Sequence, residues 1–558
     1  MADTTNQDWK DKVFLAAWRP YAWIAATGFL LYNRALSFGF TFLDDNVLIL
    51  NNLDNLRSWA IIPQAFTRDV FFTAGGAFYR PLLTLSLALD AQLGGTLPFF
   101  YHLSGIFLHL AAAALLYRLF LRLEYGKGLS LFSALVFTVH PALSQAVAWI
   151  PGRNDSLAAI FVILSFTQFI RFRSGAPGRR GAYALHLVFF ALALLTKESA
   201  AIMPAAFLAY ALLISRERSL TALLREAAGW AAVLLLWHFL RSSVLQVPGL
   251  PAAAMARSVW TNLPAFLQYA GKAVLPVNLS VMPALRDTTS VYGLLSAGVI
   301  ACALILGRPK RRAMVVFGFT WFAIFLLPSL IMNSPAQEDF MFEHRAYIPL
   351  AGLLLVFMEL VPAELSAGAA RLAGAAGLAW LCLLASVTSR HLPNFEDRLK
   401  FWGSAAAASP GSPLIHRNLG IMYFTARLYG PAEKEYLTAI ALNPSEPIVH
   451  SNLGVLYMDR GRLKEAEKAL LRELELNPRY DNGHFNLAMF RRVTGRKKEM
   501  AELLEKTLEL NPGHLYALRD LALLTARTEP CRSAAYLGRL EKLDRKTFLA
   551  VKSAIAAP

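Results

Sequence analysis

Cysteine and charge are both scarce in this chain of 558 residues, which has three cysteines and 17% charged side chains. Cys302 and Cys382 lie in apolar segments, and Cys531 lies near the C-terminus. No pair has the spacing of metal ligands, so the sequence supports neither disulfides nor a zinc site. The sequence also lacks a glycine-rich loop of the kind that cradles the phosphates of a nucleotide.

Hydrophobic residues make up 56% of the sequence, which is too much for a soluble globular protein of this length. A bilayer core of about 30 Å needs about 20 apolar residues per helix, and several windows reach that length. The formal net charge is +17, but Lys and Arg gather in short loops between apolar segments, where cytoplasmic retention explains them. The composition predicts an all-α, polytopic membrane protein and gives no support for a nucleic-acid partner.

We expect about eleven membrane spans. Two further apolar segments, residues 81–94 and 263–275, are short and are expected to form interfacial or re-entrant helices. No small-residue cleavage site follows the first apolar stretch, so we expect an uncleaved anchor there. The spans are approximately residues 20–40, 102–121, 129–140, 156–172, a segment ending at 196–198, 200–214, 227–245, a segment ending at 306, 313–332, 347–361 and 372–388.

Basic clusters mark one side of this arrangement. They are residues 10–19, 118–127, 171–180, 216–225 and 308–312, and all fall on the side opposite the first long loop, residues 41–101. The positive-inside rule therefore predicts a cytoplasmic N-terminus and an extracytoplasmic C-terminal region, in a bacterial inner membrane or an equivalent one.

A repeat of 34 residues occupies the C-terminal part of the chain. Asn418, Asn452 and Asn486 each begin an Asn-Leu-Gly or Asn-Leu-Ala triplet, and Asn-Pro pairs recur at 443, 477 and 511. This pattern predicts tetratricopeptide repeats, which are helix pairs that bury their apolar faces by stacking. We expect a membrane domain over 1–390, a linker over 391–412 and an extracytoplasmic repeat domain over 413–558.

Ionisable side chains recur at the span ends that face outward. Such groups at membrane depth are costly and tend to mark a site or a pathway. Each also has a structural alternative, because arginines snorkel to the interface, single histidines are commonly satisfied core residues, and Lys197–Glu198 can form a local ion pair. The candidates are Asp44, Asp45, Arg80, His102, His140, Arg153, Asp155, Lys197, Glu198, Glu343, His344 and Arg345.

Six segments carry a family resemblance: FLDDNVLILNNLDNLRSW (42–59), AFTRDVF (65–71), YRPLLTLSLALDAQLGGTLPFFYHLSGIFLHL (79–110), VHPALSQAVAWIPGRNDSLAA (139–159), TKES (196–199) and EHRAYIPLAG (343–352). Together with the repeats, they resemble the TMTC family, the transmembrane and tetratricopeptide-repeat protein O-mannosyltransferases. More broadly, the chain resembles membrane glycosyltransferases of the GT-C fold. Its repeat array is shorter than that of the animal relatives.

The resemblance implies transfer of a sugar, mannose or a similar one, from a polyprenyl-phosphate carrier to an acceptor outside the cytoplasm. The family's acidic motif falls on Asp44 and Asp45, of which one would be the general base and the other would raise its pKa. Cations would bind the donor phosphate, a task that suits the planar fork of arginine. Those candidates are Arg80, Arg153, Arg345, Lys197 and His102. We expect no obligatory metal or other cofactor, although two carboxylates are able to hold one.

The repeats suggest how an acceptor is held. Asn418, Asn452 and Asn486 take equivalent positions on successive helices, and the resemblance is to the asparagine ladder of the O-GlcNAc transferase repeats. Side-chain amides both donate and accept, so such a ladder would bind an extended peptide backbone. The alternative is that these asparagines cap the repeats or fill the space between them.

Three functions follow from these features. The leading hypothesis is an inverting glycosyltransferase that uses a polyprenyl-phosphate sugar and modifies protein hydroxyls. The second keeps the donor but uses a lipid or glycan acceptor, such as lipid A or a cell-wall polymer, which would not need the repeats. The third is a non-catalytic membrane scaffold whose repeats recruit exported partners. A transporter is disfavoured, because the hydropathy shows neither paired broken helices nor inverted halves.

Overall fold

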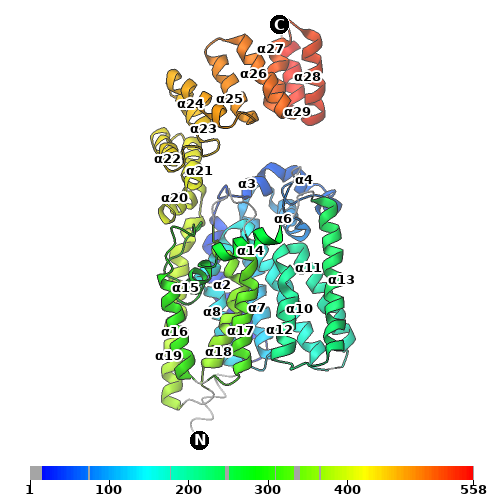
Figure 1. The fold of residues 1–558 in the computed structure, drawn as a ribbon, viewed down its shortest axis with the longest axis vertical. Coiled ribbons are helices and arrows are strands. Elements are labelled where there is room, and N and C mark those ends of the chain that lie inside the picture. Colours follow the sequence, from blue (N-terminus) through cyan, green and yellow to red (C-terminus); the bar gives the residue numbers. More distant parts are fainter. Residues whose placement is uncertain are drawn as a thin grey trace. The chain divides into compact units, whose positions relative to one another are not determined.

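The computed structural model describes residues 15–72, 76–175, 177–245, 250–307, 309–331, 340–362 and 366–556. Within these ranges every regular element is a helix, apart from one isolated antiparallel bridge between Ala284 and Phe340. The chain forms two compact units, Met1–Ser409 and Pro410–Pro558 (Figure 1). The predicted all-α class is confirmed. Arg308, part of one predicted basic cluster, lies outside the described residues.

Each of the eleven segments predicted to span the membrane contains a described helix of the first unit, and these helices run alongside one another (Figure 1). They are α2 (Arg19–Tyr32), α7 (Pro98–Arg122), α8 (Lys127–Val139), α10 (Arg153–Arg173), α11 (Arg179–Thr196), α12 (Met203–Leu213), α13 (Leu220–Val244), α16 (Val291–Gly307), α17 (Arg312–Leu326), α18 (Tyr347–Leu360) and α19 (Ala367–His391).

Five of the described helical stretches are long and apolar enough to cross a membrane by length and composition: Pro98–Arg122, Ile150–Arg173, Leu220–Val244, Arg312–Leu330 and Ala367–Phe395. A sixth candidate is the pair Lys127–Val139 and Pro141–Ala148, bent by 55° where Pro141 cannot continue the helix. Three more apolar helices are shorter: Glu198–Leu213, Val291–Gly307 and Leu350–Leu360. The chain is therefore a multi-pass membrane protein, and the number eleven stays a prediction.

Short elements and loops connect the helices at the end of the bundle where α7 begins. The two segments expected to be interfacial are the helices α6 (Pro81–Gly94) and α15 (Ala265–Val274). The others are η2 (Asn33–Ser37), α3 (Asp45–Leu48), η3 (Leu50–Asn52), α4 (Leu53–Arg57), α5 (Ile61–Thr67), η4 (Pro141–Leu143), α9 (Ser144–Ala148), η5 (Ile150–Gly152), η6 (Glu198–Ile202), α14 (Ala252–Thr261), η7 (Leu327–Leu330) and η8 (Glu343–Ala346).

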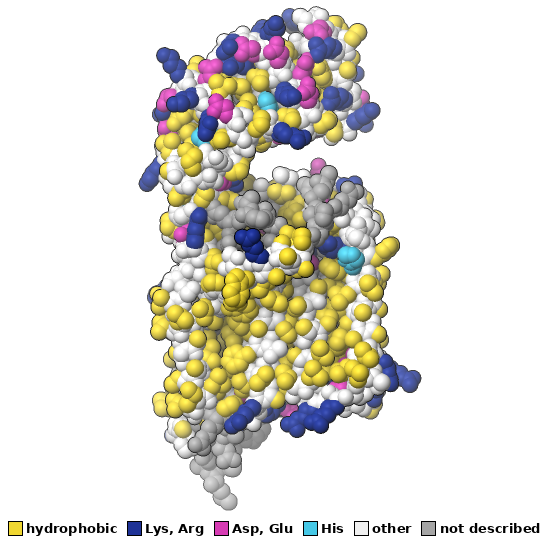
Figure 2. Space-filling view, viewed as in Figure 1, with side chains coloured by type: hydrophobic (Ala, Val, Ile, Leu, Met, Phe, Trp, Pro, Cys, Tyr) yellow, Lys and Arg dark blue, Asp and Glu magenta, His cyan; other side chains and the backbone are white. Residues whose placement is uncertain are grey.

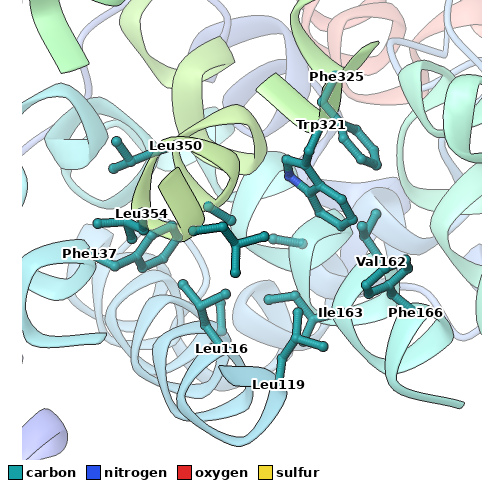
Figure 3. Packing of buried hydrophobic residues seen from close by; sticks show 14 of the residues in the cluster. Leu116, Leu119, Phe137, Val162, Ile163, Phe166, Trp321, Phe325, Leu350 and Leu354 are labelled. Atoms are coloured by element: carbon teal, nitrogen blue, oxygen red, sulfur yellow. The ribbon is translucent and has the colours of Figure 1, made fainter. Parts of the chain in front are cut away.

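The largest core of the first unit is aromatic and aliphatic (Figure 3). Phe166 of α10 packs against Trp321 of α17, with ring centroids 5.0 Å apart. Helices α17 and α18 approach closely because both crossing residues are glycines: a Cβ on Gly352 would lie 2.3 Å from the Gly318 carbonyl oxygen. Small residues at such crossings let backbones touch where lipid gives little hydrophobic drive. This packing fixes α18, which begins directly after η8.

The basic end of the bundle is separate from the end that carries the acidic loop. Helices α7 and α10 begin near that loop and end in Arg122 and Arg173, respectively. Here Arg173 pairs with Glu217 and Glu226, at 2.9 Å and 2.6 Å. On the face drawn in Figure 2, hydrophobic side chains cover most of the first unit, and Lys and Arg side chains gather along one rim. This separation agrees with the predicted arrangement of the spans, in which the basic clusters lie opposite the first long loop. Which side is cytoplasmic stays a prediction.

The second unit is a stack of helix pairs, as the 34-residue period predicts. At Gly454 an added Cβ would lie 2.6 Å from the Leu470 side chain, so the glycine lets the two helices of that repeat pack closely. The pairs are α21 (Pro413–Thr425) with α22 (Tyr429–Leu442), α23 (Val449–Asp459) with α24 (Leu463–Leu476), α25 (Asp481–Val493) with α26 (Lys497–Leu510), and α27 (Leu515–Thr525) with α28 (Pro530–Leu543), followed by α29 (Arg545–Ala556).

Most of the segment expected to be a linker, residues 391–412, is helical. It contains η9 (Leu392–Phe395) and α20 (Arg398–Ala408), which belong to the first unit. Phe395, Phe401 and Trp402 are buried there. Burial of three aromatic side chains anchors this segment to the bundle, which a free linker would not need.

Candidate active site

The acidic turn between η2 and α3 holds Asp45 through three hydrogen bonds. Thr41 donates to Asp45 Oδ2 from its backbone N–H (2.5 Å) and from its hydroxyl (3.0 Å), and the Trp149 indole donates to Oδ1 (3.1 Å). Phe42, within the turn, has a φ of 60°, which a residue with a side chain adopts only when its surroundings hold it there. Asp45 is thus a buried carboxylate with both oxygens engaged.

Asp44 lies one residue away in a different environment. It is half-buried, and none of the hydrogen bonds or ion pairs among the described residues involves its carboxylate. Burial, followed by the charge of Asp45, raises the pKa of Asp44 to about 6, while Arg80 acts in the opposite direction. A carboxylate with this pKa is a stronger base than an ordinary one and is still ionised at neutral pH.

Arg80, which directly precedes α6, pairs with Glu198 of η6 through two hydrogen bonds. Nε donates to Oε2 at 2.9 Å and Nη2 donates to Oε1 at 2.5 Å. Burial acts to lower the pKa of the Arg80 guanidinium, but neighbouring carboxylates raise it overall. These carboxylates belong to Glu198, Asp155 and Asp44. Arg80 therefore lies within electrostatic reach of the acidic turn.

Lys197 and Asp155 form a second ion pair beside the first. Lys197 Nζ donates to Asp155 Oδ1 at 2.6 Å. Asp155 Oδ2 is buried and has no hydrogen-bond partner in the described part of the chain; His344 Nε2 lies 3.9 Å away, which is too far. An open buried acceptor is costly, so Asp155 Oδ2 is an atom that a ligand or water would complete.

Three cations converge on His344. Burial, and then the positive charges of Lys197, Arg345 and Arg80, hold the pKa of His344 well below its usual range, so the imidazole is neutral. Its ring lies 5.4 Å from Trp149 between centroids, and Nδ1 is buried without a partner among the described residues. The cations and His344 come from three distant parts of the chain: residue 80, residue 197 and residues 344–345.

Arg345 differs from the other two cations in its partners. Its Nη1 donates to the carbonyls of Ser329 (3.2 Å) and Phe340 (3.1 Å), and its guanidinium lies 5.3 Å from the Phe342 ring centroid. Within the described ranges it has no carboxylate partner, unlike Arg80 and Lys197. Carbonyl bonds position a guanidinium without neutralising it, which leaves its full charge for an anionic ligand.

Glu343 holds residues 343–346 in place, and its carboxylate is engaged inside the protein. Its Oε1 accepts from Lys272 Nζ (2.7 Å) and from the Ser280 N–H (2.6 Å), and its side chain is fully buried. Sequence reasoning missed Lys272, because a single Lys in a short apolar helix is typical of an interfacial segment. Only the contact with a residue 71 positions away identifies its role.

Arg153 lies apart from the cluster. It is buried, pairs with Asp90 of α6 and donates to the carbonyls of Tyr101 and Ile150. Every nitrogen of its guanidinium therefore has a partner inside the protein. The donor-phosphate role predicted for Arg153 finds no support in this geometry, which is that of an interior ion pair.

Two predicted histidines also lie outside the cluster. His140 Nε2 bonds to the Ala273 carbonyl at 3.0 Å, and its Nδ1 accepts from the Ala142 N–H at 3.3 Å. His102 is buried edge-on against Phe38, with ring centroids 6.1 Å apart. His140 matches the satisfied core residue of the structural alternative.

The asparagines of the repeats are half-buried at equivalent positions of α21, α23 and α25. Asn486 donates to the Ser451 hydroxyl of the preceding repeat at 2.8 Å, so at this position the side chain fills the space between repeats. Asn452 Nδ2 is buried and has no partner in the described residues. Peptide binding by Asn418 and Asn452 stays a prediction.

The assembled cluster combines one partner-free carboxylate, three cations and one open acceptor. This arrangement suits a reaction in which a hydroxyl loses its proton while an anionic group leaves. Within the described ranges no group of three or more His, Cys, Asp or Glu side chains is placed to hold a metal ion.

Comparison with known proteins identifies the repeats. The tetratricopeptide repeat family matches residues 417–481 and 451–514, in agreement with the helix pairs. Among solved structures, MamA 41-end from Desulfovibrio magneticus RS-1 is 16% identical with a TM-score of 0.24, covering 27% of this chain and 85% of that one. YrrB, a TPR protein with an unusual peptide-binding site, is 22% identical with a TM-score of 0.23, covering 31% and 87%.

The relatives that match parts of the chain are named protein O-mannosyl-transferases. TMTC1 of Mus musculus is 36% identical over 157 residues, which are 27% of this chain and 16% of that protein. TMTC2 of Homo sapiens is 38% identical over 152 residues, 26% of this chain and 18% of that protein. A protein O-mannosyl-transferase of Caenorhabditis elegans is 26% identical over 448 residues, 73% of this chain and 60% of that protein. The chain spans less than two thirds of the length of each.

The similarity and the architecture agree with each other. The nematode match spans 448 residues, which is more than either compact unit contains. The two shorter matches have higher sequence identity. A helical membrane bundle followed by tetratricopeptide repeats is also the organisation that the sequence resemblance implies. The chain is a TMTC-like protein, related to the protein O-mannosyl-transferases.

Proposed function

We propose that this chain is a membrane glycosyltransferase that moves mannose or a similar sugar from a polyprenyl-phosphate carrier to hydroxyl groups of protein acceptors, on the extracytoplasmic side. The observation that carries the proposal is the Asp44 carboxylate, which is half-buried, has a pKa of about 6 and has no partner in the described residues. It lies within electrostatic reach of a cation cluster. The relatives' names as protein O-mannosyl-transferases support the same reaction class.

In this reaction Asp44 takes the proton of the acceptor hydroxyl while the hydroxyl oxygen attacks the anomeric carbon. A bond forms between that oxygen and the carbon, and the bond from the carbon to the carrier phosphate breaks. The polyprenyl phosphate leaves with the electron pair, and the configuration inverts. Asp45 holds the turn instead, because its oxygens already accept from Thr41 and Trp149.

Arg345 is the residue best suited to the donor phosphate. Negative charge builds up on the leaving phosphate, and a fixed cation aimed at it lowers the barrier. Arg345 is held by carbonyls and carries its charge unpaired within the described residues. Arg80 and Lys197 add positive field while paired to Glu198 and Asp155. This assignment replaces the wider set of cations drawn from the sequence.

The repeats take the role of the acceptor site in this proposal. Helix pairs of this kind stack into an extended surface, and Asn418 and Asn452 are half-buried at equivalent positions of α21 and α23. We assign their side-chain amides, which both donate and accept, to the peptide backbone of the acceptor. The extracytoplasmic location follows from the positive-inside rule applied to the basic clusters.

Replacing Asp44 tests the proposal directly. Asp44→Asn keeps the size of the side chain and removes the base, so we expect no transfer from a synthetic polyprenyl-phosphate mannose to acceptor peptides, with normal membrane insertion. Asp45→Asn should leave slow transfer, because it disturbs the turn and spares the base. Asp54→Asn is the matched control, since Asp54 is an exposed acid of the same loop.

Full activity of Asp44→Asn would refute the catalytic role. A wild-type chain that binds exported proteins but transfers no sugar, with the cations of the cluster tolerant to alanine, would support the scaffold function instead. Transfer to a lipid that survives deletion of residues 413–558 would support the lipid acceptor.

A further inference from the structure

Helix α20 packs directly on the acidic turn. Its Trp402 is fully buried and donates from the indole N–H to the Thr41 carbonyl at 3.0 Å. Thr41 is also the residue whose N–H and hydroxyl hold Asp45. The Arg398 guanidinium lies 5.2 Å from the ring centroid of Phe42, the residue of this turn with positive φ. One residue of the turn therefore connects α20 to the acidic pair.

The start of α20 is fixed to the residues that directly precede the acidic turn. The Gly39 N–H donates to the Glu396 carbonyl at 2.8 Å, and Arg34 pairs with the Glu396 carboxylate at 3.3 Å. Asp397 caps the helix by accepting from the Leu399 N–H at 2.8 Å. These contacts leave α20 little freedom to rotate away from the acidic turn.

The end of α20 is tied to a different segment, residues 280–284. The Ser409 hydroxyl donates to the Met282 carbonyl at 2.8 Å and accepts from the Ala284 N–H at 3.0 Å. A single buried side chain thus satisfies two backbone groups of a segment that has no regular structure. Such a contact fixes the path of the segment, because buried backbone groups need partners.

The same segment supports the cation side of the site. The Ser280 N–H donates to Glu343 Oε1 at 2.6 Å, and the Met341 N–H donates to the Pro283 carbonyl at 2.8 Å. Glu343 directly precedes His344 and Arg345. Residues 280–284 therefore lie between the end of α20 and the motif that carries the unpaired cation.

We propose that α20 braces the active site: Trp402 and Ser409 are positioning residues that set the placement of the base at Asp44 relative to the cations at residues 344–345. The inference rests on the proposed function, in which base and cations act on one substrate. Catalysis of this kind depends on alignment, and a displacement of about 1 Å can cost about a hundredfold in rate. The two sides come from segments about 300 residues apart, so an element that contacts both fixes their separation.

Trp402→Phe tests the brace in the full-length membrane protein. It keeps an aromatic ring in place and removes only the N–H that reaches Thr41. We expect kcat to fall by about tenfold or more, with KM values for the polyprenyl-phosphate sugar and the acceptor peptide nearly unchanged. Thr41→Val should lower kcat in the same way, and Thr41→Ser should restore it. The double variant Trp402→Phe with Thr41→Val should lose less than the product of the two single losses.

Trp321→Phe is the matched control. Trp321 is equally buried and donates its indole N–H to the Ile348 carbonyl, also at 3.0 Å, within the helix bundle. The Trp321→Phe variant loses the same kind of hydrogen bond. It should lower the melting temperature by a similar amount without changing kcat. Equal kcat for the two tryptophan variants, or a kcat loss that only follows melting temperature, would overturn the brace.

Hydrogen exchange separates this inference from the proposed function. We expect Trp402→Phe, and not Trp321→Phe, to speed amide exchange over residues 39–45. Faster exchange with unchanged kcat would overturn the positioning role, and unchanged exchange would overturn the brace itself. Faster exchange in a chain whose wild type transfers no sugar would refute the proposed function and, with it, the positioning role, while leaving the contact in place.

Discussion

The ion pair between Arg80 and Glu198 should set the pH at which the proposed transfer activity appears. The base must be ionised, so kcat/KM should fall as the pH drops through the pKa of Asp44, about 6. The charge of Arg80 lowers that pKa. Arg80→Gln should therefore move the acidic limb of the profile to higher pH. Glu198→Gln should move it to lower pH, because it leaves the charge of Arg80 without its partner.

The size of the shift follows from the position of Arg80. An opposite charge within about 4–6 Å shifts a carboxyl pKa by about 1–3 units. Arg80 is shared between Glu198, Asp155 and Asp44, and its effect on Asp44 is smaller than those of burial and of Asp45. We therefore expect about 1 unit for Arg80→Gln, which is about 1.4 kcal/mol. At pH 6 this would reduce the ionised fraction of Asp44 about fivefold.

The assay is a pH profile of kcat/KM for sugar transfer between pH 5 and 8.5, on purified protein in detergent or lipid. A loss in donor binding lowers kcat/KM on the plateau at high pH, whereas a change in the pKa of Asp44 moves the midpoint of the acidic limb. The midpoint therefore reports the pKa. Arg68→Gln, an exposed arginine of the same loop, is the control for loss of a positive charge. The reasoning fails if Arg80→Gln leaves the limb in place or if both variants move it in the same direction.

Two further predictions concern stability. Gly352→Ala puts a Cβ 2.3 Å from the Gly318 carbonyl oxygen. We expect a lower melting temperature and a loss of about 1–3 kcal/mol in the free energy of unfolding. Gly298→Ala, with open space around the added Cβ, should have little effect in the same melting experiment. Glu473 is buried and accepts hydrogen bonds from two backbone N–H groups and one side-chain amide. Glu473→Gln turns one acceptor into a donor and should destabilise the repeats by about 1–3 kcal/mol in urea unfolding. Glu475→Gln, at an exposed position, should leave the unfolding free energy unchanged.

Local patterns were sufficient to predict most of the helices. Long apolar windows and the 34-residue period are signals within short stretches of chain, and α6 has the same bounds as the predicted short helix, residues 81–94. Helix α20 has no such pattern, because its sequence mixes charged, aromatic and small residues. Phe401 and Trp402 are buried, and the Trp402 indole donates to the carbonyl of Thr41, which is distant in the sequence. A contact of that range leaves no periodic pattern.

The candidate site also has features that local sequence patterns predict and features that depend on distant contacts. Sequence reasoning found the end of the bundle that carries the acidic turn and most of the residues that gather there. It could not separate Arg153 from Arg345, because both are arginines at the end of an apolar segment. The difference lies in tertiary partners: Arg153 pairs with the carboxylate of Asp90, whereas Arg345 donates to backbone carbonyls and lies over the Phe342 ring, with no ion pair among the described residues. It also missed Trp149, whose indole links Asp45 to the ring of His344.

The division of roles between Asp44 and Asp45 has a physical basis that adjacency alone does not reveal. Neighbouring residues on a helical turn point about 100° apart, so two adjacent carboxylates face different surroundings. Asp45 raises the pKa of Asp44 only while it is itself ionised. Burial opposes that charge, and the donors on Thr41 and Trp149 favour it. These hydrogen bonds therefore tune the base through its neighbour, and a variant such as Thr41→Val should change both the position of Asp44 and the pH at which it acts.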